Sequence, residues 1–283
     1  MFLNQRIYCK VVGGLGNQLF IYSCAKALAL KNKCPLILDH RYGFVNDDYG
    51  RKYLLDVFQI NDHKSRWRVF FYIYFLDRIP FISQLIIPEC IYIKEENNKV
   101  LKSEIINNDI QSSVYLDGYW QSFKYFKDYN TEIQQSLRLK SLNLNADNES
   151  LLKLILSSNS VAVHIRRVRY KCILPLEYYK KAINKLNNKM DHLKYFIFSD
   201  DIAFCKEHFN FDTNINFVKS NEEDDGITDF YLMKQCNHFI IANSTFSWWA
   251  AWLSGDVKKV VIAPENTHIG VKGYYYPDTW IQV

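Results

Sequence analysis

The chain has 283 residues, of which 48% are hydrophobic and 23% are charged, and its formal net charge is +5. This composition is typical of a globular protein, excludes a disordered chain, and at this length favours two domains. The charge is modest and no Lys/Arg run is long, so no nucleic-acid partner is expected.

The N-terminal residues predict a βαβ unit. An apolar strand, IYCKVV, precedes the turn GGLGNQ at 13–18, a helical run continues to about Leu30, and the strand PLILDH follows. Glycines in the turn permit close approach of a ligand, and the helix start offers N–H groups to an anion or a hydroxyl. A purely structural turn is the alternative, because the third glycine of the dinucleotide fingerprint is missing. No signal peptide is evident, which favours a cytoplasmic location.

The pattern between about Asp47 and Tyr129 is irregular and rich in aromatic residues. Its most apolar part, 67–93, is interrupted by charges and prolines, so no uninterrupted stretch reaches the ~20 residues that span a bilayer. We expect either a buried helix pair or a peripheral contact with the inner face of the plasma membrane.

The polar stretch at 143–150 predicts a link between domains 1–148 and 149–283. After it, strands alternate with helices, and the strands are SVAVHI, KYFIFS, INFVKS, HFIIA and KKVVIA. This alternation predicts a parallel sheet covered by helices. We therefore expect an α/β protein with two Rossmann-like domains facing across a cleft, and ligands at the carboxyl ends of the strands.

Seven scattered cysteines lie mostly in apolar runs and form no CxxC pair, which indicates reduced core thiols. They are Cys9, Cys24, Cys34, Cys90, Cys172, Cys205 and Cys236.

Two arginines end the strand SVAVHI. Arg166 and Arg167 follow His164 closely, at the carboxyl end of a predicted central strand. Guanidinium groups there supply fixed charge and paired donors for a phosphate. Ion pairs with carboxylates of neighbouring loops are the structural alternative.

A second anion pocket is predicted after the strand HFIIA. Asn243 is followed by Ser244 and Thr245 at a helix start, and one of these hydroxyls is expected to cap the helix. The same N–H groups suit an anion. The tryptophans that follow have helical spacing and are expected mainly in the core. They are Trp248, Trp249 and Trp252.

Three adjacent acid pairs raise the question of a metal: Asp47 and Asp48, Asp200 and Asp201, and Asp224 and Asp225. Only the second pair directly follows an apolar strand, where its carboxylates could instead accept hydrogen bonds from a ribose or a base. We expect no metal site.

Together these segments resemble glycosyltransferase family 11, the α-1,2-fucosyltransferases of bacterial surface-sugar pathways and of blood-group synthesis. The resemblance is carried by GGLGNQLFIYSCAKALA, YLDGYWQSFKYF, VHIRR, FSDD and ANSTFSWWAAWL, in this order. It implies a fold of the GT-B type and a metal-independent transfer with inversion at the anomeric carbon. It also implies GDP-fucose as the donor, bound mainly by residues 149–283, and makes residues 1–148, with the GGLGNQ turn, the acceptor-side domain.

The resemblance implies roles for individual residues. Arg166 contacts the β-phosphate and Asn17 lies near the reacting sugar, so these two are the candidate catalytic residues. Asp229 holds the guanine or the ribose. The full set of expected donor-binding residues is His164, Arg167, Asp229, Asn243, Ser244, Thr245, Phe246, Asp200, Gly14 and Gly16.

The implied acceptor is the 2-hydroxyl of a galactose-terminated glycan, in surface polysaccharide or O-antigen synthesis, with a lipid-linked acceptor as a further expectation. One departure from the family pattern leaves alternatives open. The family continues HxRR with Gly-Asp-Tyr, whereas this chain has Val168, Arg169 and Tyr170. A catalytically impaired binding relative and a transferase that uses another GDP-sugar are therefore alternative hypotheses.

Overall fold

The structure is a computed structural model, and it forms two compact units. The described residues are 5–45, 47–65, 69, 71–72, 75, 90–96, 102, 105, 110–168, 172–209, 214–219, 221, 226–255, 258–265 and 275–283. Unit 1 comprises Met1–Lys140 and Gly270–Tyr276, and unit 2 comprises Ser141–Ile269 and Pro277–Val283. The division after Lys140 precedes the polar stretch at 143–150 that the sequence suggests as the link.

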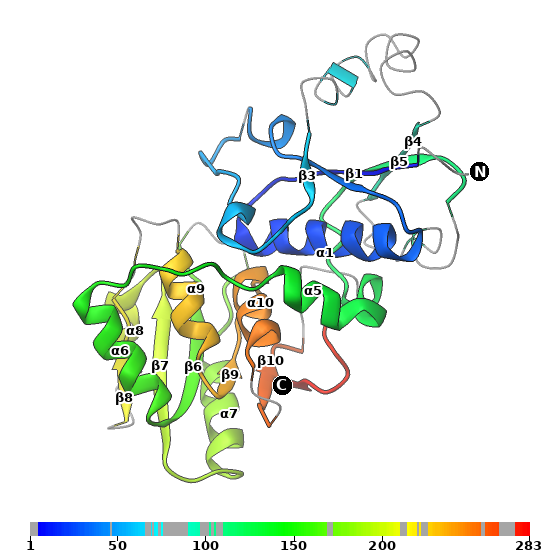
Figure 1. Cartoon of the computed structure of the whole chain (residues 1–283). Helices are drawn as coiled ribbons and strands as arrows, with labels where there is room; N and C mark the ends of the chain where they lie inside the picture. The colour runs from blue at the N-terminus through cyan, green and yellow to red at the C-terminus, as the bar shows by residue number, and fades with distance from the viewer. Residues whose placement is uncertain are drawn as a thin grey trace. The chain divides into compact units, whose positions relative to one another are not determined.

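Unit 1 contains a five-stranded parallel sheet in the order β3-β2-β1-β5-β4. Its elements are β1 (Ile7–Lys10), α1 (Leu15–Lys31), β2 (Leu36–Asp39), η1 (Tyr42–Phe44), η2 (Leu55–Val57), β3 (His63–Lys64), β4 (Cys90–Lys94), β5 (Ser113–Asp117), η3 (Phe123–Tyr125), η4 (Lys127–Tyr129) and α5 (Asn130–Ser136). Helix α1 packs against β1 and β2 and runs along the sheet (Figure 1).

Strands β3, β4 and β5 correct the interpretation of the middle region as irregular. Strand β5 pairs with the central strand β1, with Val114 opposite Ile7, and its residues Val114, Tyr115 and Leu116 are all buried. A strand that is covered on both faces shows no alternation of polar and apolar residues, so periodicity alone does not reveal it. The aromatic residues there form a buried cluster with Tyr8, Tyr72 and Cys90.

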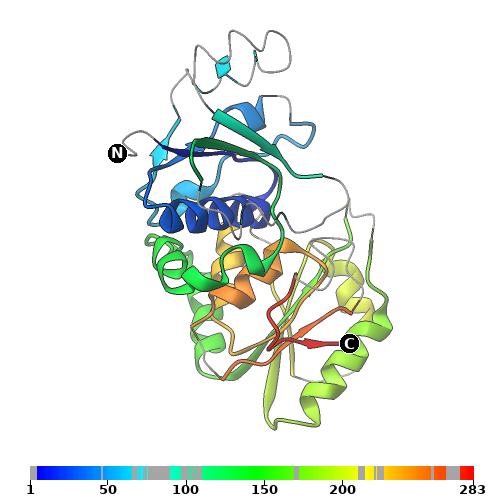
Figure 2. The same ribbon diagram turned by 90° about the vertical axis from the view of Figure 1, so that its right-hand side faces the viewer.

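Unit 2 contains a six-stranded parallel sheet in the order β11-β10-β9-β6-β7-β8. Its elements are α6 (Ala146–Leu156), β6 (Asn159–Ile165), α7 (Leu176–Asn187), β7 (Leu193–Ser199), α8 (Ile202–His208), β8 (Ile215–Phe217), α9 (Ile227–Lys234), β9 (His238–Ile240), α10 (Thr245–Leu253), β10 (Val261–Ala263) and β11 (Ile281–Gln282). Helices flank these strands (Figure 2). The predicted α/β class, with a parallel sheet in each unit, is confirmed.

Alternate residues of β6 point to opposite faces of this sheet. Val161, Val163 and Ile165 pack with the apolar face of α7 in one core cluster. His164 therefore lies on the other face, where its ring centroid is 5.7 Å from that of Phe246 in α10. The alternation decides which side chains at the end of β6 can meet the α10 N-terminus.

The core contains the tryptophans and most of the cysteines, as predicted. Trp248 and Trp249 are fully buried, and Trp252 is 6% exposed. All seven cysteines are free, and five of them are buried. Burial raises the pKa of these thiols, for example to about 11 for Cys205, which is typical of inert structural cysteines.

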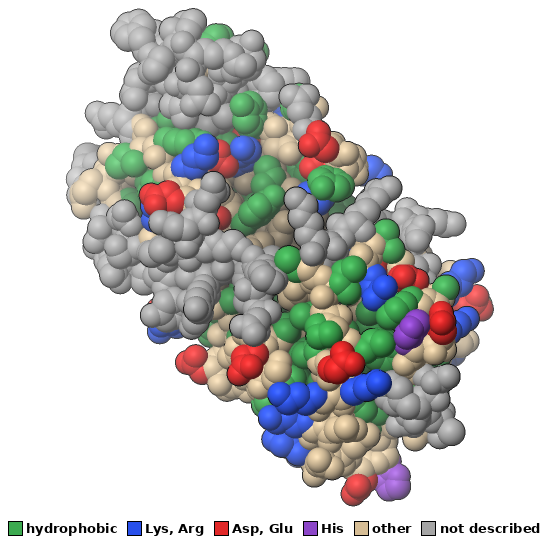
Figure 3. Space-filling view, turned by 180° about the vertical axis from the view of Figure 1, so that it is seen from behind, with side chains coloured by type: hydrophobic (Ala, Val, Ile, Leu, Met, Phe, Trp, Pro, Cys, Tyr) green, Lys and Arg blue, Asp and Glu red, His purple; other side chains and the backbone are tan. Residues whose placement is uncertain are grey.

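The described helices include none that is long and apolar enough to cross a membrane. Most of the apolar stretch 67–93, for which we expect a helix pair or a membrane contact, lies outside the described residues. On the face shown in Figure 3, acidic and basic side chains of the described residues lie near one another.

Candidate functional site

The carboxyl ends of β6 and β7 bring an arginine and an aspartate together. These strands are parallel neighbours with Ile165 opposite Ser199, so the residues that follow each strand lie side by side. Nη1 of Arg166 lies 3.0 Å from Oδ2 of Asp200. The Arg166 side chain remains 42% exposed, and that of Asp200 is 19% exposed.

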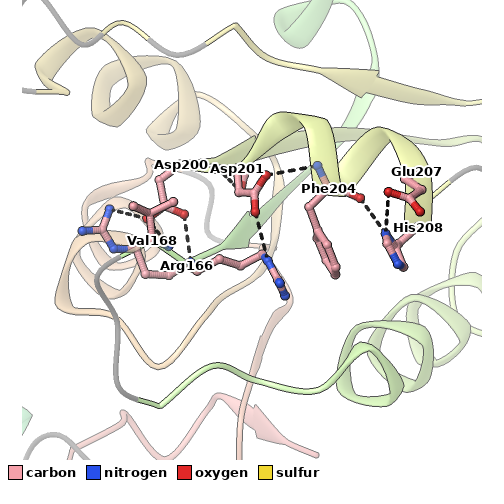
Figure 4. Close-up of polar contacts among 9 residues, drawn as sticks. Arg166, Val168, Asp200, Asp201, Phe204, Glu207 and His208 are labelled. Atoms are coloured by element: carbon pink, nitrogen blue, oxygen red, sulfur yellow. Dashed lines mark hydrogen bonds and ion pairs between the residues drawn. The ribbon is translucent and has the colours of Figure 1, made fainter.

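Asp200 also fixes the backbone that follows β6. Its Oδ1 accepts a hydrogen bond from the N–H of Arg167 at 2.8 Å, and its Oδ2 accepts one from the N–H of Val168 at 3.0 Å (Figure 4). A single carboxylate thus holds both the Arg166 side chain and the following turn. Arg169, where the chain departs from the family pattern, lies outside the described residues.

Arg167 is held against helix α8. Its Nε lies 3.3 Å from Oδ2 of Asp201, and its guanidinium carbon is 3.3 Å from the ring centroid of Phe204. Asp201 also caps α8, because its Oδ1 accepts a hydrogen bond from the N–H of Phe204 at 3.1 Å. Both arginines are therefore paired with carboxylates, as the structural alternative predicted, and Arg166 is the more exposed of the two.

His164 is a buried, neutral imidazole. It is 7% exposed, and its Nδ1 has no hydrogen-bond partner among the described residues. Burial, and then the charge of Arg166, lower its pKa from 6.5 to about 3. A buried nitrogen without a hydrogen-bond partner is costly in a folded protein, so a bound water or ligand is expected to satisfy it.

The N-terminus of α10 lies on the same face of the sheet as His164. Ser244 is the N-cap, and its hydroxyl oxygen accepts a hydrogen bond from the N–H of Phe246 at 3.3 Å. Of the two hydroxyls considered from sequence, Ser244 is the one that caps. Asn243 is 1% exposed and donates from Nδ2 to the carbonyl oxygen of Cys172 at 2.9 Å. Thr245 begins the helix and is partly buried.

Asp229 lies in the first turn of α9 and is bound to Asn221. The side-chain nitrogen of Asn221 donates to Oδ1 of Asp229 at 2.6 Å, and its backbone N–H donates to Oδ2 at 3.3 Å. Asn148 in α6 donates to Asn221 in turn, at 2.8 Å. The structure thus places Asp229 in a polar network, and its role toward guanine or ribose stays a prediction.

The glycine turn of unit 1 is hydrogen-bonded to the segment after β5, which is distant in sequence. Gly14 is the N-cap of α1, and Gly16 is buried in its first turn. Oδ1 of Asn17 accepts a hydrogen bond from Nε2 of Gln121 at 3.0 Å. Gln18, which is fully buried, donates to the carbonyl oxygen of Gly13 at 2.8 Å. Sequence reasoning included Gln18 in the turn at 13–18 without giving it a role of its own. It did not single out Gln121, which lies in YLDGYWQSFKYF, a segment used only for the resemblance.

Three of the acids in the pairs that suggested a metal have other partners. Asp200 and Asp201 bind the arginines and backbone N–H groups described above, and Asp47 pairs with Arg51. Asp224 and Asp225 lie outside the described residues. Across the part of the chain that the structure describes, no group of three His, Cys, Asp or Glu residues could hold a metal ion.

The sequence profile described as "Glycosyl transferase family 11" matches residues 83–281. The chain belongs to glycosyl transferase family 11. As a member of family 11 it is a glycosyltransferase, and the expected resemblance is confirmed.

Curated relatives of this family 11 chain include two proteins of Escherichia coli. One is an alpha-1,2-colitosyltransferase, 29% identical over 91% of this chain and 91% of its own. The other is the O-antigen biosynthesis glycosyltransferase WbnK, 28% identical over 98% of this chain and 100% of its own. Galactoside 2-alpha-L-fucosyltransferase SEC1 of Bos taurus is 28% identical over 50% of this chain and 42% of its own.

A solved structure confirms the fold of the family 11 chain. The fucosyltransferase NodZ from Bradyrhizobium superposes with a TM-score of 0.56 at 14% identity, covering 88% of this chain and 92% of NodZ. A NodZ alpha-1,6-fucosyltransferase has also been co-crystallized with GDP. The architecture is that of the GT-B fucosyltransferases, as the resemblance implied.

Proposed function

We propose that the chain transfers L-fucose from GDP-fucose to the 2-hydroxyl of a galactoside, with inversion at the anomeric carbon. The observation that carries this proposal is the positive group Arg166 at the carboxyl end of β6, beside the strand that leads into α10. Membership of family 11, the α-1,2 and fucosyl specificities in relatives' names, and the GDP complex of NodZ support it.

The donor diphosphate would be bound by groups of unit 2 that suit an anion. Arg166 can exchange its ion pair with Asp200 for the β-phosphate, because its side chain is 42% exposed. The N-terminus of α10, at Ser244 and Thr245, supplies N–H groups and the positive end of a helix dipole. His164 would supply its buried Nδ1 to a polar group of the nucleotide.

In the proposed reaction, the acceptor 2-oxygen attacks C1 of fucose and the bond from C1 to the β-phosphate oxygen breaks. Positive charge develops on the sugar ring and negative charge on the departing GDP, and Arg166 stabilises the latter. A donor of this kind is typically worth about 3–4 kcal/mol of barrier lowering. The acceptor proton leaves late, to water or to the departing diphosphate, so the step needs no strong protein base. Arg166 and the α10 N-terminus supply the charge stabilisation that a metal supplies in other transferases.

A second candidate donor comes from the relative named alpha-1,2-colitosyltransferase. Colitose is fucose without its 3-hydroxyl, so the same diphosphate groups would serve both donors. Selection between them depends on whether a protein group is hydrogen-bonded to the 3-hydroxyl, because leaving such a group unpaired is costly.

The biological acceptor in this proposal is a galactose-terminated glycan of a surface polysaccharide or O-antigen, which the relative WbnK supports. A cytoplasmic enzyme with peripheral contact to the inner face of the plasma membrane would reach a lipid-linked acceptor.

The test is incubation with GDP-fucose, GDP-colitose or GDP-mannose and a panel of galactosides, followed by linkage analysis of the product. We expect an α-1,2-fucosylated galactoside from GDP-fucose. Preference for GDP-colitose would support the second candidate. Transfer with none of the donors, together with a rise in melting temperature on adding GDP, would support a catalytically impaired relative.

A further inference from the structure

The turn that follows β5 in unit 1 has an unusual backbone. Trp120 has φ of +52°, in the left-handed region, where a bulky residue other than glycine is rare. Its ring is fully buried and lies edge-on to Tyr125, with centroids 5.9 Å apart. Such a conformation costs free energy, so the surrounding structure must hold it in place. Residues in such conformations cluster at ligand sites.

The strained conformation separates two neighbouring aromatic rings. Trp120 is fully buried, whereas Tyr119 is 39% exposed. The Tyr119 ring lies beside Gly13, because a Cβ added to this glycine would be 3.3 Å from Cε1 of Tyr119. The turn thus presents one aromatic ring to solvent next to the glycine turn of α1.

Glu95, directly after β4, fixes this turn. Its Oε2 accepts hydrogen bonds from the N–H groups of Tyr119 at 2.6 Å and Trp120 at 3.1 Å. Gly118 is required beside it, because an added Cβ would lie 2.3 Å from that of Glu95. The exposed ring is therefore attached to a rigid backbone, which lowers the entropy lost on binding a ligand.

Two amide side chains lie at the same end of the sheet. Gln121 donates to Asn17 at 3.0 Å, across 104 positions in the sequence. Amides donate to and accept from hydroxyl groups without carrying charge. An aromatic ring with a few fixed polar groups is the usual make-up of a site for a small neutral ligand.

We propose that Tyr119, Gln121 and Asn17 form the binding site for the galactoside acceptor, with the Tyr119 ring against the apolar face of the sugar. This inference rests on the proposed function. The axial 4-hydroxyl of galactose leaves the hydrogens on C3, C4 and C5 on one face, and that face can stack on an aromatic ring. The guanidinium groups for a diphosphate belong to unit 2, so the neutral set in unit 1 suits the acceptor.

The test compares Tyr119→Ala with Tyr119→Phe, which keeps the ring. Tyr49→Ala is a matched control, because Tyr49 is an exposed tyrosine of the same unit (59%) whose ring instead lies under Arg51. We expect Tyr119→Ala to raise KM for methyl β-D-galactopyranoside about tenfold or more and to leave KM for GDP-fucose unchanged. Tyr119→Phe, which keeps the ring, should have an acceptor KM well below that of Tyr119→Ala, and Tyr49→Ala should stay close to wild type.

Unchanged acceptor KM in a folded Tyr119→Ala protein would overturn the proposal, as would an equal rise in KM for the donor. A wild-type protein that transfers no fucose would refute the proposed function alone. In that case, saturation-transfer NMR with methyl β-D-galactopyranoside decides. Loss of the wild-type signal in Tyr119→Ala supports the site, and no wild-type signal, or a retained signal in the variant, overturns it.

Discussion

The carboxyl ends of the two sheets differ in chemistry although the sheets share a parallel architecture. In unit 2 that end presents charge, with Arg166 and Arg167 paired to Asp200 and Asp201. In unit 1 that end includes the ion pair of Lys10 with Asp117, but the turn after β5, called the neutral end below, presents an exposed ring beside amides. Strand ends are the usual ligand positions in α/β proteins. This difference supports the proposal that unit 2 binds the diphosphate donor and unit 1 the neutral sugar acceptor.

The two ends also differ in how their key group is held. Arg166 is held by an ion pair with a partly exposed carboxylate, which a diphosphate can replace. Tyr119 is held through its backbone, by hydrogen bonds to Glu95 and by the strained residue that follows it. The charged end can therefore exchange partners on binding, whereas the neutral end is already arranged.

The largest expected effect is at the charged end. Arg166→Ala should lower kcat about 10²- to 10³-fold, because it removes charge stabilisation of the departing phosphate. The fold should persist, since the side chain is 42% exposed and lies beyond the strand. Steady-state kinetics and thermal unfolding measure both. Full activity in a folded variant would refute the phosphate role.

Arg167→Ala is the matched control for that experiment. Its guanidinium packs on Phe204 and pairs with Asp201, so its loss should reduce stability by about 1 kcal/mol and the rate less than Arg166→Ala does. Equal losses of kcat in both variants would contradict the distinction between the two arginines.

The sequence predicted this charged end better than the neutral one, for physical reasons. Strand β6 is a short apolar run and α7 has one apolar face, so periodicity predicts both. That β7 is the neighbour of β6, which lets Asp200 reach Arg166, is a property of sheet order. The contact between Asn17 and Gln121 depends on β5 entering the sheet beside β1, which no local pattern reveals.

The second effect concerns pH at the charged end. The pKa of His164 is lowered to about 3 in the folded protein, so between pH 6.5 and 3 the unfolded state binds more protons. Stability should therefore fall as pH decreases, by about 2 kcal/mol from pH 7.5 to 5.0 from this residue. Guanidinium unfolding of wild type and His164→Gln at both pH values measures it. The free energy of unfolding should fall less between the two pH values in His164→Gln than in wild type. Equal falls in both proteins would show that His164 does not titrate as described.

A smaller effect is expected at the neutral end, in the glycine turn. Gly13 has φ of +77°, and an added Cβ would lie 2.8 Å from Nδ2 of Asn17. Gly13→Ala should therefore lower the free energy of unfolding by about 1–2 kcal/mol. Gly14→Ala is the control, because nothing lies within 4 Å of its added Cβ and its φ is −73°. The free energy of unfolding of Gly14→Ala should fall by at most about half as much as that of Gly13→Ala. A larger fall in Gly14→Ala than in Gly13→Ala would contradict the strain argument.

The smallest expected effect is that of chelation, which tests whether the charged end acts without a metal. Asp200 and Asp201 are the acids best placed near the proposed diphosphate. However, Asp200 accepts from Arg166 and two backbone N–H groups, and Asp201 accepts from Arg167 and the α8 N-terminus. A metal bound there would displace these arginines from their carboxylates while adding charge that Arg166 and the α10 N-terminus already supply.

We therefore expect that EDTA, added at about 5 mM to remove divalent ions, leaves kcat within about twofold of its untreated value. A matched assay with added Mn²⁺ should show little change. Complete loss with EDTA and recovery with Mn²⁺ would show that a metal, rather than the arginine and the helix terminus, neutralises the leaving group.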